Sequence, residues 1–223
     1  MKQFGAGIAI TGTGAATPTG TIDNEDLSQI VETSDEWIQT RTGIRQRRLA
    51  SAEESLTAIA AQAANQAIAM AGIQAIEIDL IILATSTPDD LFGSASQIQA
   101  LIGASRAVAF DMTAACSGFV FGLVTAAQFI RTGVYQNVLL IGADWLSRWV
   151  DWSDRRTCVL FGDGAGAVVI QANPEGDRLL GFELCSDGTQ NHTLNLSYQA
   201  QSQPLGKDFS ISRGHYGPIT MNG

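Results

Sequence analysis

The sequence predicts an α/β fold, and two features of its apolar pattern predict it. Continuous apolar runs of strand length recur along the chain, most clearly at Leu80–Ala84 and Val138–Ala143. Helix-like segments that end in glycine separate these runs. Strands that are apolar throughout are typical of a parallel-type sheet that helices cover on both faces. With 223 residues, 45% of them hydrophobic, the chain has enough apolar material for a large core.

The expected elements follow from local signals. Ser34 is a candidate N-cap for a helix with acidic residues in its first turn and Gly43 just beyond its end. A longer helix is rich in alanine and has Gly72 at its C-terminal position. In chain order, we expect a strand at Phe4–Thr13, helices at Asp23–Val31, Asp35–Thr42 and Glu54–Ala71, a strand at Leu80–Ala84, a helix at Ser94–Ile102, a strand at Ala107–Asp111, a helix at Cys116–Arg131 and a strand at Val138–Ala143.

The pattern changes after Asp144. Two β-like runs, Cys158–Phe161 and Ala165–Gln171, are joined by a glycine-rich segment that predicts a tight turn. One more strand is expected at Leu179–Cys185. From Asp187 onward the chain is polar and shows no strong period.

Composition excludes several classes of protein. No apolar run approaches the roughly 18 residues that a membrane span needs, and the first residues have no signal-peptide arrangement. The three cysteines are far apart, which fits neither a disulfide framework nor a zinc site, so we expect a reduced, cytoplasmic protein without a structural metal. A net charge of −9 argues against nucleic-acid binding. Four arginines, Arg41, Arg45, Arg47 and Arg48, form either a solvated surface or a site for a phosphate-bearing ligand or an acidic partner.

Two glycine-rich segments imitate dinucleotide-binding loops. Gly12–Thr17 lacks the third small residue and is followed by Pro18, and Gly162–Gly166 leads into a strand-like run rather than a helix. The dinucleotide-binding motif holds the phosphates at the N-terminus of the helix that follows it, and neither segment leads into such a helix. We therefore expect no nicotinamide or flavin cofactor and interpret both segments as turns in which glycine allows a positive φ.

Cys116 is the main candidate for chemistry. It follows the predicted strand Ala107–Asp111 and begins a predicted helix, so its sulfur faces the positive end of that helix, where the thiolate is favoured over the thiol. The alternative is an inert buried cysteine among Ala114 and Ala115. Position alone leaves both interpretations open.

Three segments together resemble β-ketoacyl-acyl carrier protein synthase III, the family that starts type II fatty acid synthesis. They are Ser34–Arg45, Ala109–Phe119 around Cys116, and Asp154–Ala167. The resemblance is collinear over most of the chain. It implies a thiolase-like fold of two similar halves, each a mixed sheet between helices. Residues 1–173 then form the first half with the nucleophilic cysteine, and residues 174–223 form only the first strand and cap region of the second.

The resemblance also implies a reaction and roles for particular residues. Cys116 would take an acyl group from acyl-CoA as a thioester, and malonyl-acyl carrier protein would lose CO₂ and attack it. No separate cofactor is needed, because acyl-CoA is a substrate. The match places Trp37 and Arg155 on the CoA adenine and Arg41 on a CoA phosphate, with a helix-face core residue as the alternative for Trp37. Phe92 would reach across a homodimer into the partner's acyl pocket, and Phe161 would line the inner pocket or belong to the ordinary core.

The sequence also departs from the family. Its members use a Cys-His-Asn set, but His192, His215 and Asn222 match none of the family's catalytic motifs, so we assign none of them. We expect this polypeptide alone not to condense malonyl-acyl carrier protein and to be poorly soluble. Arg156 adds a second charge beside Arg155. Two alternatives to a fatty-acid synthase III are a secondary-metabolism condensing enzyme with another starter and a non-catalytic remnant that serves as a binding module.

Overall fold

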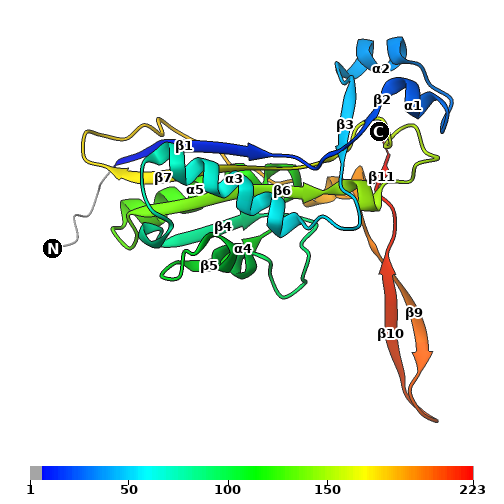
Figure 1. Cartoon of the computed structure of the whole chain (residues 1–223). Helices are drawn as coiled ribbons and strands as arrows, with labels where there is room; N and C mark the ends of the chain where they lie inside the picture. Colours follow the sequence, from blue (N-terminus) through cyan, green and yellow to red (C-terminus); the bar gives the residue numbers. More distant parts are fainter. Residues whose placement is uncertain (1–6, 223) are drawn as a thin grey trace. The chain divides into compact units, whose positions relative to one another are not determined.

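The computed structural model describes residues 7–222, which form two compact units (Figure 1). The first unit contains the chain up to Gly20, Arg48–Trp145 and Asp163–Leu184, and the second contains Thr21–Arg47, Leu146–Gly162 and the chain from Cys185 onward. The chain thus passes between the units several times. The division into halves at residues 173 and 174 stays a prediction, and the expected strand residues Phe4–Ala6 lie outside the described part.

A mixed sheet of five strands is the centre of the first unit. Strand β4 pairs in parallel with β5 and with β6, whereas β7 pairs antiparallel with β6 and with β1. The α/β class is therefore confirmed. In spatial order, the strands are β1 (Gly7–Ala16), β7 (Asp163–Asn173), β6 (Asn137–Trp145), β4 (Leu80–Ala84) and β5 (Val108–Met112).

Helices cover both faces of this sheet, as the apolar strands predicted. Because side chains alternate along a strand, Ile81 and Leu83 of β4 pack with helices α3 (Leu56–Ala71) and α4 (Ala95–Ile102). Leu80 and Ile82 pack instead with α5 (Gly118–Arg131). All five residues of β4 are buried, so this strand anchors the core between two layers of helix.

The glycines of β1 serve close packing, and the expectation of turns at these positions is wrong. Gly12 and Gly14 lie inside β1, Gly164 and Gly166 lie inside β7, and none of them has a positive φ. A Cβ on Gly12 would lie 2.1 Å from the carbonyl oxygen of Ala67 in α3. The backbone of α3 therefore packs directly on the backbone of β1, which a side chain would prevent.

Asp177 ties the segment after β7 to the rest of the first unit. Its carboxylate accepts hydrogen bonds from the N–H of Ile8 (3.3 Å), the N–H of Leu179 (3.0 Å) and Nε of Arg131 (2.8 Å). Burial alone would raise the pKa of Asp177, but the hydrogen bonds from Leu179, Arg131 and Ile8 outweigh it and hold the pKa below its ordinary value of 3.8.

We expect Asp177→Asn to lower the melting temperature at neutral pH. A carboxylate whose folded-state pKa is depressed contributes stability above its unfolded pKa and loses it as the pH falls through the folded value. The difference in melting temperature between wild type and variant should therefore shrink as the pH falls below 3.8. Thermal unfolding across this pH range checks the prediction, and a difference that is constant with pH would contradict it.

The second unit has a small core of its own. Its helices are α1 (Asn24–Ser28) and α2 (Asp35–Thr42), and α2 has the predicted bounds, with Ser34 accepting a hydrogen bond from the N–H of Trp37. Its buried residues include Leu27, Ile38 and Cys158. The remaining strands are short pairs, namely β2 (Gly20–Asp23) with β3 (Gln46–Leu49), β8 (Leu194–Asn195) with β11 (Thr220–Met221), and β9 (Tyr198–Pro204) with β10 (Ser210–Tyr216).

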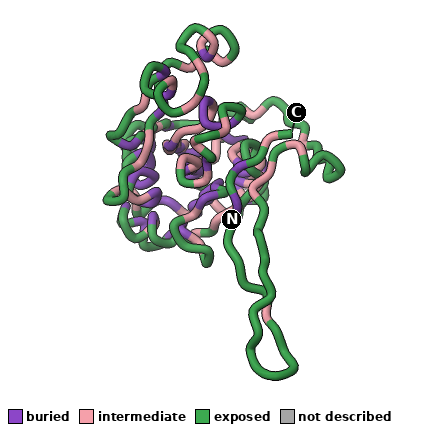
Figure 2. Tube along the Cα trace, turned by 90° about the vertical axis from the view of Figure 1, so that its right-hand side faces the viewer, coloured by how far each residue is buried: buried purple, intermediate pink, exposed green. Residues whose placement is uncertain are grey.

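Two expectations for the later part of the chain are wrong. Cys158–Phe161 is a buried turn, in which the N–H of Cys158 donates to the carbonyl of Asp154, because its apolar residues fill the core of the second unit without pairing to a strand. Leu179–Cys185 forms no strand, since no described segment pairs with it. The polar region contains the unexpected hairpin β9–β10, which is exposed along almost its whole length (Figure 2).

No helix within residues 7–222 combines the length and the hydropathy that a membrane crossing requires.

Candidate functional site

Cys116 lies at the carboxyl-terminal edge of the parallel strands in the first unit. Strand β5 ends at Met112, a short 3-10 helix spans Ala115–Ser117, and α5 begins at Gly118. The predicted helix start at Cys116 is therefore two residues early, because a tighter turn precedes α5. The Cys116 side chain is exposed, so the inert buried alternative is wrong. This edge of an α/β sheet is where such folds bind ligands.

The backbone just before Cys116 is strained. Ala115 has φ +46°, and it is the one non-glycine residue with a positive φ in the described part of the chain. An L-residue in this region costs free energy, and such residues cluster at functional sites. The strain is confined to the turn that presents the Cys116 thiol.

Helix α5 approaches the sheet closely behind this turn. A Cβ on Gly118 would lie 3.3 Å from the Cβ of Ala84, and a Cβ on Gly122 would lie 2.4 Å from Cδ1 of Leu140. Ser117, the N-cap residue, makes no side-chain capping bond, so its hydroxyl does not cover the helix end. The spacing of four between Gly118 and Gly122 is a signal of this packing that our sequence interpretation missed.

A pocket of about 470 Å³ lies beside β5 in the same unit. Its walls include Thr113, which precedes Cys116, together with Phe110 of β5 and Leu91 and Phe92 of the loop before α4. Leu91 and Phe92 are almost fully exposed, at 83% and 103%. The expectation that Ala107–Asp111 is a buried strand is wrong, because β5 is the edge strand and Phe110 is 36% exposed.

In the second unit, the structure brings Trp37, Arg41 and Arg155 together. The guanidinium carbon of Arg41 lies 4.4 Å from the centroid of the Trp37 ring, and that of Arg155 lies 5.2 Å from it. Nη1 of Arg155 donates to the carbonyl of Glu32 at 3.1 Å, which fixes its position. Two guanidinium planes beside one indole suit a flat, negatively charged ligand.

Thr33 lies next in sequence to Glu32, the partner of Arg155, and the sequence did not single it out. Its hydroxyl oxygen is buried without a hydrogen-bond partner in the described structure. A buried hydroxyl that lacks a partner costs free energy unless a ligand or water satisfies it. Nothing in the sequence marks Thr33, because its burial depends on how the segment between α1 and α2 folds.

Comparison with known proteins decides the family. The family profile for 3-oxoacyl-[acyl-carrier-protein] synthase III matches residues 110–188. The β-ketoacyl-[acyl-carrier-protein] synthase III of Acaryochloris marina is 64% identical over 223 residues, which cover 100% of this chain and 67% of that protein. The chain belongs to the β-ketoacyl-acyl carrier protein synthase III family. The enzyme of the same name from Trichormus variabilis is 72% identical over 97% of this chain and 66% of its own length.

Solved structures of this synthase III family support the fold. The crystal structure of 3-oxoacyl-(acyl carrier protein) synthase III from Pseudomonas aeruginosa has a TM-score of 0.80 and 37% identity, covering 93% of this chain and 63% of that one. The enzyme from Aquifex aeolicus has a TM-score of 0.72 and 45% identity, covering 88% and 59%. The thiolase-like fold expected from the resemblance is thus confirmed. The chain spans about two thirds of the length of the curated relatives, at 66–67%.

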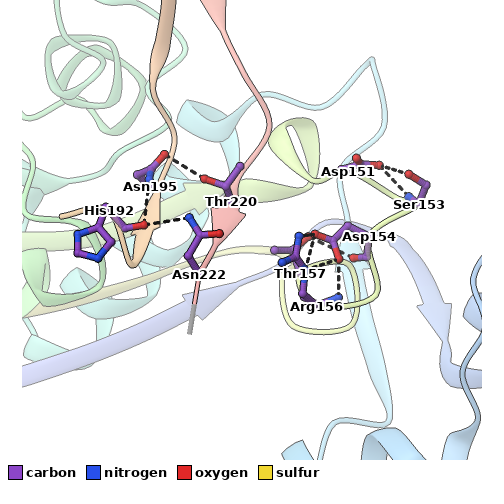
Figure 3. A network of polar contacts seen from close by, with 9 residues as sticks. All are labelled: Asp151, Ser153, Asp154, Arg156, Thr157, His192, Asn195, Thr220 and Asn222. Atoms are coloured by element: carbon purple, nitrogen blue, oxygen red, sulfur yellow. Dashed lines mark hydrogen bonds and ion pairs between the residues drawn. The ribbon is translucent and has the colours of Figure 1, made fainter. Parts of the chain in front are cut away.

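Phe161, which the resemblance places in an acyl pocket, and Arg156, which departs from the family pattern, both lie in the second unit. Phe161 is half-buried and packs on the core of the second unit, so its role in an acyl pocket stays a prediction. Arg156 forms an ion pair with Asp154 (2.9 Å), which holds the pKa of Asp154 below its ordinary value chiefly through the side-chain hydrogen bonds (Figure 3).

The arginine cluster is not a single surface. Arg47 is buried at 4% exposure, donates to the carbonyl of Val159 through Nε (3.1 Å) and also contacts the side chain of Asn24. Burial lowers the pKa of Arg47. This arginine therefore holds the buried turn of the second unit and is not available to a phosphate or an acidic partner, which corrects the interpretation of the four arginines as one group.

Asn222 and the two histidines make contacts within the second unit, and Asn222 holds a loop there. Its amide donates to the backbone carbonyl of His192 (3.2 Å), as does the amide of Asn195 (3.4 Å). The His192 imidazole points away from these contacts (Figure 3). His215 lies opposite Gln199 in the exposed hairpin. These contacts belong to the second unit, where they close a loop.

Proposed function

We propose that this chain carries the acyl-accepting part of a synthase III, in which Cys116 is the nucleophile. The observation that carries the proposal is the exposed Cys116 thiol, presented by a strained turn between β5 and α5. Its thiolate attacks the carbonyl carbon of an acyl-CoA, a new C–S bond forms, and the bond to the CoA sulfur breaks to release CoA. The acyl group then stays on Cys116 as a thioester.

The second step completes the function of the family. Malonyl-acyl carrier protein loses CO₂, and the resulting carbanion attacks the Cys116 thioester to give 3-oxoacyl-acyl carrier protein and the free thiolate. Negative charge develops on the thioester oxygen in both steps, and we infer that the backbone N–H of Cys116 is one donor that stabilises it. This two-step reaction initiates type II fatty acid biosynthesis.

We infer that the cluster of Trp37, Arg41 and Arg155 binds the nucleotide end of acyl-CoA. The Trp37 indole and the Arg155 guanidinium provide flat surfaces for stacking on adenine, and Arg41 provides positive charge for a phosphate. The buried Thr33 hydroxyl is a further polar group next to this region. All three residues of the cluster belong to the second unit.

Trp37→Ala should weaken the binding of acyl-CoA. Loss of one stacking partner is worth about 1 kcal/mol, so we expect the acetyl-CoA concentration that gives half-maximal single-turnover acylation of Cys116 to rise about fivefold, with a smaller change in the maximal acylation rate. Rapid-quench measurement of acylation at several acetyl-CoA concentrations checks this result. Trp152→Ala is the matched control, because it also removes a half-buried tryptophan that packs on the same core. If Trp152→Ala weakened acyl-CoA binding as much as Trp37→Ala, Trp37 would act only as a core residue.

We also propose that the protein works as a homodimer in the cytoplasm. Within the described residues, β5 is an edge strand with Val108 and Phe110 exposed, and a pocket and the protruding side chains of Leu91 and Phe92 lie beside it. A pocket and an apolar protrusion beside one edge strand suit a two-fold interface between identical copies. The free thiols support a reducing compartment.

Mass spectrometry tests the central proposal. Incubation with acetyl-CoA should add one acetyl group to the intact chain and release an equal amount of CoA, and peptide mapping should place the group on Cys116. A series of longer acyl-CoAs then defines the starter, which bears on the alternative of secondary metabolism. An unmodified Cys116 after incubation with every acyl-CoA of the series would overturn the proposal.

A further inference from the structure

The loop between β4 and α4, residues 85–94, is held at both ends by carboxylates. At its start, Asp144 of β6 accepts a hydrogen bond from the N–H of Ser86 (2.8 Å). At its end, Asp111 of β5 accepts from the N–H of Ser94 through both oxygens (3.0 and 2.9 Å). Both carboxylates come from strands of the five-stranded sheet, so both ends of the loop are hydrogen-bonded to that sheet.

The middle of the loop is fixed by its own side chains. The buried Ser94 hydroxyl accepts from the N–H of Asp89 (3.0 Å) and of Asp90 (3.3 Å). The Asp90 carboxylate in turn accepts from the N–H of Phe92 (2.9 Å), and the Asp90 carbonyl accepts from the N–H of Gly93 (3.0 Å). Gly93 has φ +114°, which closes the turn. Asp90 therefore sets the backbone direction at Phe92.

This turn holds two large apolar side chains away from their own chain. Leu91 is 83% exposed and Phe92 is 103% exposed, although the backbone that carries them is hydrogen-bonded on both sides. Because the segment is already ordered, binding through its exposed apolar side chains costs little further conformational entropy. If the loop were mobile, binding would also have to order its backbone, which costs free energy.

We propose that Asp90 is a positioning residue that presets Phe92 for insertion into the pocket of a second copy of this chain. The proposal rests on the homodimer proposed above and adds the group that controls its acyl pocket. Asp90 is itself exposed, so it contributes little to the core of its own subunit. Its carboxylate acts through the N–H of Phe92 and touches neither the acyl group nor Cys116.

Three variants of the 223-residue chain test this role. Asp90→Ala removes the acceptor, Asp90→Asn keeps an amide oxygen at the same place, and Glu53→Ala removes another exposed carboxylate of the same unit. The readouts are the dimer dissociation constant by sedimentation equilibrium, the ratio of Cys116 acylation rates with acetyl-CoA and a longer acyl-CoA, and the melting temperature.

We expect Asp90→Ala to raise the dimer dissociation constant about three- to tenfold and to change the ratio of acylation rates, because one hydrogen bond that orders Phe92 is lost. Asp90→Asn and Glu53→Ala should behave as the wild type, and all variants should melt at the wild-type temperature. A dimer and a rate ratio unchanged in Asp90→Ala would overturn the role of Asp90 while leaving the proposed function intact. A monomeric wild type would overturn the dimer and the role of Asp90 together.

Discussion

Replacing Cys116 by serine should abolish acyl-enzyme formation with acetyl-CoA. A serine hydroxyl stays protonated at neutral pH, whereas the thiolate is the reactive form of cysteine. Removing an enzyme's nucleophile typically lowers the rate by more than about 10³-fold. Because the Cys116 side chain is exposed, we expect the stability of the fold to change by no more than about 0.5 kcal/mol. Intact-mass measurement after incubation with acetyl-CoA checks the first result, and urea unfolding checks the second.

The other two cysteines provide the controls. Cys158 is fully buried, and burial raises the pKa of its thiol above the ordinary value of 9.0, so it should remain unmodified. Cys185 is exposed, but it is followed by the single 3-10 turn Gly188–Gln190 and not by an α-helix. Cys185→Ser should therefore acylate at the wild-type rate. Acetylation that persists in Cys116→Ser and disappears in Cys185→Ser would transfer the role of nucleophile to Cys185.

Cap residues and apolar runs in the sequence predicted the elements whose bounds depend on neighbouring residues. Helix α2 begins after Ser34 and ends before Gly43, as the cap residues indicate, and β4 has the bounds of its apolar run. The position of Cys116 between a strand and a helix was predicted in the same way, since a strand followed by a small-residue turn and a helix is visible in sequence. In these segments the deciding interactions lie within a few residues of one another.

Features that depend on distant contacts were missed. The apolar composition of β5 suggested burial, yet whether a strand is central or at the edge depends on the order of pairing. Arg47 looked like a member of a charged surface, but its guanidinium is satisfied by the carbonyl of Val159, 112 positions away. The proximity of Trp37 and Arg155 came from the family resemblance, because no local pattern connects them.

The glycines of β1 show most clearly that a residue's role can depend on a partner far away in sequence. A glycine in sequence indicates either a turn with positive φ or a close backbone approach, and the two look alike without the partner. In β1 the partner is α3, which begins 40 residues after the strand ends. The register of β1 on β7 also shifts between Ile10 and Gly12, so the strand is irregular where α3 crosses it.

Gly12→Ala should be among the most destabilising single substitutions in the chain. The new Cβ would lie 2.1 Å from the carbonyl oxygen of Ala67 and 2.7 Å from the amide nitrogen of Ala71, and both are backbone atoms that cannot rotate away. Helix α3 must then move off the sheet and open its buried interface, for which we expect a loss of about 3 kcal/mol in the free energy of unfolding. Gly181→Ala is the matched control, because its Cβ would meet nothing within 4 Å and its φ is not positive. Urea unfolding of both variants measures the difference, and a Gly12→Ala protein as stable as Gly181→Ala would show that α3 does not rest on the β1 backbone.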